Sequence, residues 1–174
     1  MKTQRFVGLL TVCGMLLSFS GSALSGGTQF GYWNEFNINS INGTYGGIQT
    51  CEEWFTPSGG SAQKYDISTV FHSSQNGGAF TGTFTATFGD TFAASGFVCS
   101  GIFSGTSIVH ADGTGTSQDT IHYTSGPCTD ASETASFVIA NGGNLINGVT
   151  TSVTIPASVG TVNSLVCSTT QTRQ

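Results

Sequence analysis

The sequence predicts an all-β protein whose strands form a single antiparallel up-and-down β-barrel of about eight strands. Helix signals are nearly absent, and Thr, Ser, Gly, Val, Ile and Phe dominate, as they do in strands and turns. Short strand-like segments follow one another along the chain, separated by dipeptides typical of tight hairpins. A meander of this size avoids open edges most simply by closing into a barrel, and a β-sandwich is the alternative.

The clearest strand is predicted over residues 80–88. One parity of this segment carries apolar side chains and the other carries hydroxyls, since Phe80, Phe84, Ala86 and Phe88 alternate with Thr81, Thr83, Thr85 and Thr87. Successive side chains of a strand point to opposite faces, so one face is aromatic and the other is polar. We therefore expect a half-buried antiparallel strand here.

Turn residues divide the rest of the chain. Five dipeptides favour the positive φ of a tight hairpin: Asn42-Gly43, Asn76-Gly77, Asp112-Gly113, Asn141-Gly142 and Asn147-Gly148. Strands are expected over residues 44–55, 65–72, 80–88, 95–103, 106–110, 116–123, 136–140, 149–155 and 161–169. Two further segments, 56–63 and 126–133, have the Pro and Gly content of exposed loops.

The N-terminus has the pattern of a secretory signal peptide over residues 1–23. Lys2 and Arg5 precede an apolar run over residues 6–19, and small residues follow up to Ala23, the expected cleavage site, with Ser25 as the alternative. The apolar run is too short to span a bilayer, and no membrane span is expected elsewhere. The sequence thus predicts a secreted, periplasmic or cell-surface protein, with an aromatic segment over 24–43 and the barrel domain over 44–174.

The charge of the mature chain excludes some partners. Once the signal peptide is removed, nine acidic residues face only Lys64 and Arg173, a net charge of −7. Two cations cannot form a basic patch, so nucleic acid is not an expected partner. Because charged residues make up only 7% of the sequence, the polar surface must come from Ser, Thr, Asn and Gln. Such a surface suits proteins that face carbohydrate or assemble into extracellular layers.

Four cysteines remain in the mature chain: Cys51, Cys99, Cys128 and Cys167. An even number in an exported domain predicts two disulfides, with three possible connectivities. The cysteines lack a C-x-x-C pair and a zinc-like His spacing, so neither a metal site nor a cofactor is expected. In a closed meander the first and last strands are neighbours, which favours Cys51–Cys167; Cys99–Cys128 would then attach the second loop to a strand.

The histidines offer the only basis for an enzyme. His110 and Asp112 share a parity at a hairpin end, and His122 lies on the strand expected to return beside it. The simpler interpretation is that Asp112 stabilises the Asp-Gly turn and both histidines are surface residues. Glu52 and Glu53 face opposite ways on a strand, so they cannot act as an acid/base pair. No catalytic residue is assigned.

The phenylalanines are the best candidate binding surface. An aromatic interior is expected from Phe71, Phe80, Phe84, Phe88, Phe92, Phe97, Phe103 and Phe137. Plain core packing would explain them. If the barrel leaves a cavity, the same side chains would line a site for an apolar ligand, with Phe80, Phe84, Phe88, Phe97 and Phe137 as the candidate ligand-binding residues.

Several segments together resemble a known group of proteins. They are residues 41–45, 78–84, 108–116 and 136–139, the last followed by Asn141-Gly142-Gly143, and the chain end Arg173-Gln174. In this order they resemble an uncharacterised family of small exported Gly/Thr-rich bacterial β-barrel proteins. The resemblance implies a lipocalin-like or calycin-like barrel and brings no catalytic residue with it.

These observations lead to three hypotheses of function. The first is a secreted binding module for a small apolar or carbohydrate ligand. The second is a structural or adhesive extracellular or envelope protein that associates with itself, because a surface so poor in charge repels its own copies weakly. An enzyme that uses His110 and His122 is the third.

Overall fold

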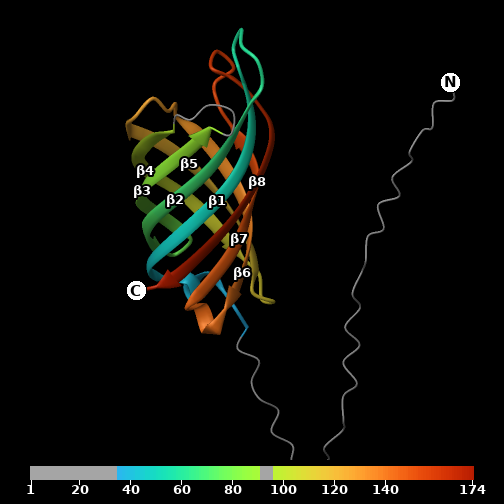
Figure 1. The fold of residues 1–174 in the computed structure, drawn as a ribbon. Coiled ribbons are helices and arrows are strands. Elements are labelled where there is room, and N and C mark those ends of the chain that lie inside the picture. Colours follow the sequence, from blue (N-terminus) through green and yellow to red (C-terminus); the bar gives the residue numbers. More distant parts are fainter. Residues whose placement is uncertain (1–34, 91–95) are drawn as a thin grey trace, which may run out of the picture. The chain divides into compact units, whose positions relative to one another are not determined.

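The structure, a computed structural model, describes residues 35–90 and 96–174, which form a closed barrel of eight antiparallel strands (Figure 1). Each strand pairs with the next along the chain, and the last pairs with the first. The predicted up-and-down barrel is confirmed, and the sandwich alternative is wrong. The strands are β1 (Gly43–Pro57), β2 (Gln63–Asn76), β3 (Ala79–Asp90), β4 (Phe97–Val109), β5 (Thr114–Ser125), β6 (Ala131–Ala140), β7 (Leu145–Thr154) and β8 (Gly160–Arg173).

Two short 3₁₀ helices, η1 (Ile38–Ile41) and η2 (Asn141–Gly143), complete the fold. The predicted signal peptide, residues 1–23, lies outside the described residues, as does the aromatic segment up to residue 34. Within the described part of the chain, no helix is long and apolar enough to cross a membrane.

The predicted alternation in β3 is confirmed. Phe84 and Ala86 are 9% and 2% exposed, whereas the alternating threonines Thr83, Thr85 and Thr87 are exposed on the outside of the barrel. The hairpins at Asn76-Gly77 and Asp112-Gly113 also stand where they were expected, between β2 and β3 and between β4 and β5.

Several sequence-based boundaries are wrong. Strand β6 begins at Ala131, inside the expected loop 126–133 and before the expected strand 136–140. The expected strands 95–103 and 106–110 are one continuous strand, β4, in which Gly105 pairs with Phe80 on one side and Asp119 on the other. Asn147-Gly148 lies inside β7, so its glycine is not a turn residue; the β6–β7 connection is η2. Asn42-Gly43 joins η1 to β1 and makes no hairpin.

Some glycines within the strands were wrongly predicted as turn residues, because they lie on the inner wall of the barrel. Six glycines lie directly opposite a phenylalanine of the adjacent strand, in the pairs Gly47–Phe71, Phe80–Gly105, Gly82–Phe103, Phe84–Gly101, Gly115–Phe137 and Phe137–Gly148. A Cβ at Gly82 would lie 2.3 Å from Cζ of Phe103, so the ring occupies the space that a side chain would need. The rings therefore lie against the neighbouring backbone instead of filling the middle of the barrel.

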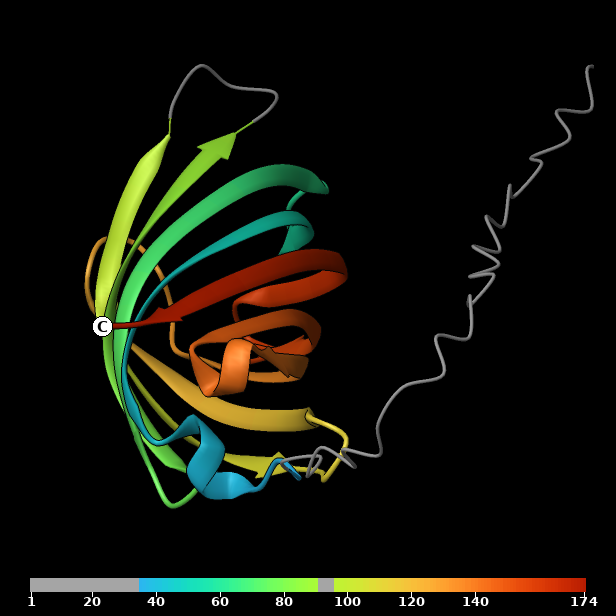
Figure 2. The ribbon, with the colours of Figure 1, turned by 90° about the horizontal axis from the view of Figure 1, so that it is seen from below.

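One end of the barrel is closed by apolar packing. Ile41, Tyr45, Ile139 and Ile146 form the fully buried cluster, at the end that carries both 3₁₀ helices and is turned toward the viewer in Figure 2. The Tyr45 hydroxyl donates to the carbonyl of Gly143 at 2.7 Å. Arg173 Nη2 donates to the Ser40 carbonyl at 2.8 Å and to the Tyr45 hydroxyl at 2.9 Å. These contacts join η1, η2 and the end of β8.

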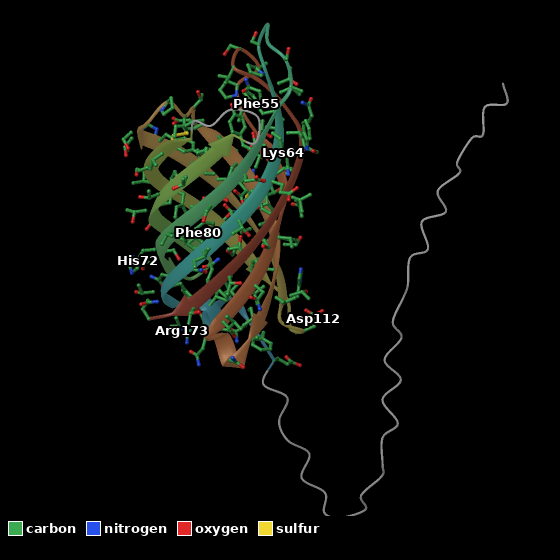
Figure 3. The ribbon with its side chains drawn as sticks, viewed as in Figure 1. Phe55, Lys64, His72, Phe80, Asp112 and Arg173 are labelled. Carbon is green, nitrogen blue, oxygen red and sulfur yellow. A yellow bond between two sulfur atoms is a disulfide. The ribbon has the colours of Figure 1, made fainter. Side chains whose placement is uncertain are left out.

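The opposite end of the barrel carries the hairpin connections β1–β2, β5–β6 and β7–β8, where Figure 3 labels Phe55 and Lys64, far from Asp112 and Arg173. Tyr65, Phe88 and Phe97 form an aromatic cluster toward this end. The rings of Phe88 and Phe97 stack with centroids 4.7 Å apart, and Tyr65 meets Phe97 edge-on at 5.8 Å. Aromatic side chains thus cover the β2–β4 side of this end of the barrel.

Two disulfides link the barrel in the pairing that the closed meander favoured. Cys51–Cys167 joins β1 to β8 across the seam of the barrel, with a sequence separation of 116 between the two cysteines. Cys99–Cys128 joins β4 to the β5–β6 loop. Two disulfides in a domain of this size are typical of an oxidising environment.

Candidate functional site

The barrel encloses a cavity of about 180 Å³. All eight strands contribute inward-facing side chains to its lining. Most of these side chains are only half-buried, because they face open space instead of one another. The barrel is therefore hollow, which sequence alone could not decide.

An aromatic wall covers one side of the cavity, from β2 to β5. Phe103 is at its centre, with ring centroids 5.9 Å from Phe71, 6.1 Å from Phe80 and 6.4 Å from Phe84. Tyr123 extends the wall through an edge-on contact with Phe84 at 5.2 Å. Such a surface offers apolar contact and ring stacking to a bound molecule.

Four of the five predicted ligand-binding residues line this cavity: Phe80, Phe84, Phe88 and Phe137. The fifth, Phe97, does not line it and instead stacks on Phe88. The structure adds Phe71, Phe103 and Tyr123 to the lining. Phe92, expected among the interior aromatics, lies outside the described residues. That any of these side chains binds a ligand stays a prediction.

A polar wall from β1, β6 and β7 faces the cavity as well. Glu133 Oε1 accepts hydrogen bonds from Gln49 Nε2 at 3.0 Å and from Thr150 Oγ1 at 2.6 Å. Gln49 Nε2 also donates to Thr150 Oγ1 at 3.1 Å. Strands β1 and β6 are not neighbours, so these bonds run across the inside of the barrel.

Three carboxyl groups point into the cavity: Glu53, Asp119 and Glu133. Burial, together with the charge of Glu133, raises the pKa of Asp119 from its usual 3.8 to about 7. Burial also raises the pKa of Glu53, and it raises that of Glu133 against the opposing effect of its two hydrogen bonds. The residues that line the cavity include no Lys, Arg or His to neutralise these groups.

Nearby carboxylates also affect the pKa of Tyr123, the tyrosine of the aromatic wall. Burial is the main cause that raises the pKa of Tyr123 to about 12, and the carboxylates of Glu53, Glu133 and Asp130 add to it. Tyr123 therefore keeps its proton, and its hydroxyl can donate a hydrogen bond inside the cavity.

The interior carboxyls were not predicted, although the alternation of residues along the strands indicates that they point inward. Asp119 has the same strand parity as Ile121 and Tyr123, which points it inward. Glu133 likewise shares a parity with Ala135 and Phe137. The inward orientation of these acidic residues can be predicted from the sequence. Their proximity in an open cavity depends on closure of the barrel.

The structure does not bring the two candidate histidines together. His110 follows the end of β4, whereas His122 pairs with Ile102, seven residues from that end, so the two lie roughly 25 Å apart. Asp112 accepts hydrogen bonds from the backbone N–H and the hydroxyl of Thr114, at 2.9 and 2.7 Å, and so stabilises the turn.

His122 has a different acidic partner. Its Nδ1 lies 2.7 Å from Oδ2 of Asp130, on the exposed outer face of the barrel. Asp130 also accepts a hydrogen bond from the backbone N–H of Tyr123 at 2.9 Å, which fixes the β5–β6 loop. In the described part of the chain, no group of three or more His, Cys, Asp or Glu is placed to hold a metal ion.

Fold and cavity together define the class: a disulfide-linked, up-and-down eight-stranded β-barrel with a hollow, acidic and aromatic interior. No family model and no curated protein sequence matches the chain. Among solved structures, the S-type phycobiliprotein lyase CPES from Guillardia theta matches with a TM-score of 0.35 and 8% identity, over 84% of this chain and 98% of that one. The resemblance to exported Gly/Thr-rich proteins stays a prediction.

Proposed function

We propose that this protein is a secreted binding module that takes a small, largely apolar ligand into its barrel. The observation that carries the proposal is the cavity of about 180 Å³ with one aromatic and one polar wall. Binding sites for small molecules are typically concave and mostly apolar, with a few polar groups that orient the ligand. A cavity of about 150 Å³ is known to be large enough for a benzene ring, so a single ring with a short substituent fits this space.

Secretion is supported by independent features. Two disulfides suit an oxidising compartment. The pattern of residues 1–23 predicts the signal that would deliver the chain there. N-terminal sequencing of the protein purified from its host's medium or periplasm tests this step, and a mature chain that starts at Leu24 or Gly26 is the expected result. A mature protein that still begins at Met1 would contradict it.

Ligand binding is tested with 2-phenylethanol, a neutral probe of suitable size, by calorimetry or ligand-detected NMR. We expect binding to the wild-type protein and its loss in Ala135→Phe, because Ala135 lines the cavity and a ring there occupies the space. Ser136→Phe is the matched control, since Ser136 is the next residue and has the opposite parity. Equal binding by both variants would place the probe outside the barrel and contradict the proposal. Glucose is the corresponding probe for the carbohydrate alternative.

A second candidate, self-association, is favoured by the outer face of the barrel. Eight aliphatic side chains on strands are exposed there, up to 73% for Val166: Ile48, Val70, Val98, Ile102, Ile108, Val138, Val149 and Val166. Few charges oppose contact between copies. Sedimentation velocity at rising concentration tests this candidate; a single monomeric species throughout would exclude it.

A further inference from the structure

Among the residues that the structure describes, the acidic groups inside the barrel have no partner of opposite charge. Asp119 pairs directly with Glu133 across β5 and β6, which brings their Cβ atoms to about 5 Å. Glu133 has two hydrogen-bond donors, but Asp119 has no hydrogen bond or ion pair within the described residues. When both groups are ionised, like charges directly opposite each other are destabilising, and a cation bound between them would remove the repulsion.

The positions of Glu53 and Tyr123 extend the acidic region toward the aromatic wall. Glu53 lines the same cavity, and its charge, like that of Glu133, acts on the Tyr123 hydroxyl. Tyr123 in turn contacts Phe84. A molecule held by the carboxylates would thus touch aromatic rings on its other side, and aromatic faces attract cations as well as apolar groups.

A second observation concerns a buried polar side chain of the cavity lining. Ser73 is 2% exposed and lines the cavity, yet its hydroxyl has no hydrogen-bond partner in the part of the chain that the structure describes. Buried polar groups without a partner are rare, because each costs about 1 to 3 kcal/mol. The hydroxyl is therefore available to a polar atom of a ligand or to a water molecule that accompanies it.

We propose that the cavity selects organic cations, namely a protonated amine on an aromatic or aliphatic body, with the ammonium held by Asp119 and Glu133. The apolar body lies against the wall formed by Phe84, Phe103 and their neighbours. This inference rests on the proposed binding function and adds the charge and chemical class of the ligand. An ammonium supplies both the positive charge and the hydrogen-bond donors that the carboxylates lack.

The test compares three probes that share a phenyl ring and a two-carbon linker: 2-phenylethylamine, 2-phenylethanol and 3-phenylpropanoate. At pH 8 we expect the amine to bind at least ten-fold more tightly than the alcohol, and the anion to show no binding. Asp119→Asn is expected to remove most of the preference for the amine, and Glu53→Gln to remove a smaller part of it. Binding of the alcohol to these variants is expected to change less than two-fold, because the apolar contacts are unchanged.

Glu52→Gln is the matched control, since Glu52 is adjacent to Glu53 but lies outside the barrel, 3.2 Å from Lys64. Its amine affinity is expected to equal that of the wild-type protein. Circular dichroism of every variant confirms that the barrel is retained. A loss of amine binding in Glu52→Gln as large as that in Asp119→Asn would assign the effect to surface charge and overturn the inference.

The pH dependence gives an independent readout. The titratable groups around Asp119 are Glu133 on β6 and Tyr123 on its own strand, β5. Strand β4, which pairs with β5 on the other side, carries no group that titrates. Glu53 faces the cavity from β1. Because the pKa of Asp119 is raised to about 7, amine affinity should rise as the carboxyl ionises, by up to about a hundred-fold between pH 5 and pH 8. Alcohol affinity should not change.

The outcomes separate this inference from the proposed function. If the alcohol binds as tightly as the amine, or the anion binds best, the cavity is a binding site but does not select cations, and the inference is overturned. If none of the three probes binds, both proposals fail. Preferential binding of the amine that depends on Asp119 and on pH supports both.

Discussion

The pH dependence of folding stability is the most direct consequence of the buried carboxyl at Asp119. Its pKa is raised from 3.8 to about 7 in the folded protein, mainly by burial. A raised pKa means that folding favours the protonated carboxyl. The stabilising effect is therefore complete below about pH 4 and is lost as the pH rises through about 7. Wild-type stability should fall across this window.

The magnitude follows from the shift of about three pKa units. One unit corresponds to about 1.4 kcal/mol, so ionisation of Asp119 destabilises the fold by at most roughly 4 kcal/mol. Water that enters the cavity screens the charge, and about 2 to 4 kcal/mol is the expected range. Asp119→Asn has nearly the same shape and cannot ionise, so it should gain this amount relative to wild type between pH 4 and pH 8.

Urea denaturation followed by circular dichroism at pH 4, 6 and 8 measures the free energy of unfolding of both proteins. Glu52→Gln is again the control: this exposed carboxylate pairs with Lys64 on the outer face, so its removal should change stability by less than about 1 kcal/mol at every pH. Stability curves of wild type and Asp119→Asn that run parallel from pH 4 to pH 8 would refute the reasoning. They would mean that the carboxyl is hydrated in the folded protein.

Three further predictions concern the barrel itself and can be checked by the same denaturation assay. Gly82→Val should destabilise the fold by about 2 kcal/mol or more, since its side chain meets the ring of Phe103; unchanged stability would show that the ring can move away. Tyr45→Phe should cost about 1 to 3 kcal/mol, because it leaves a buried carbonyl and the end of β8 without their hydroxyl partner, and a neutral effect would contradict the closed end described above. Replacing both Cys51 and Cys167 by Ala should cost about 5 kcal/mol, given their sequence separation of 116, and a loss below 1 kcal/mol would show that strand pairing alone closes the barrel.

Much of the fold could be predicted because its signals are local. The alternation of Phe and Thr over residues 80–88 reports which face of β3 is buried, whatever the strand pairs with. Gly77 and Gly113 adopt positive φ in the turns that the dipeptides Asn76-Gly77 and Asp112-Gly113 predict, for reasons contained in two residues. The proximity of Cys51 and Cys167 needed only one further assumption, that a meander of this length closes on itself.

The errors arose where a residue's role depends on a neighbouring strand. Gly105 and Gly148 look like turn residues along the chain, yet each lies inside a strand opposite an aromatic residue. A glycine that makes room for a ring of the next strand has the same local sequence as a glycine that turns the chain. Only the register of the strands distinguishes the two.

The sequence by itself determined the fold class, the inward and outward faces of the strands and the aromatic character of the interior, because each depends on the parity of neighbouring residues. Only the tertiary structure decided that the barrel is hollow and that Asp119 and Glu133 face each other inside it. Cavity volume depends on how the phenylalanine rings lie against glycines of adjacent strands, and the interaction of the carboxyls depends on register. Both are distances between residues far apart in the chain, which no local pattern records.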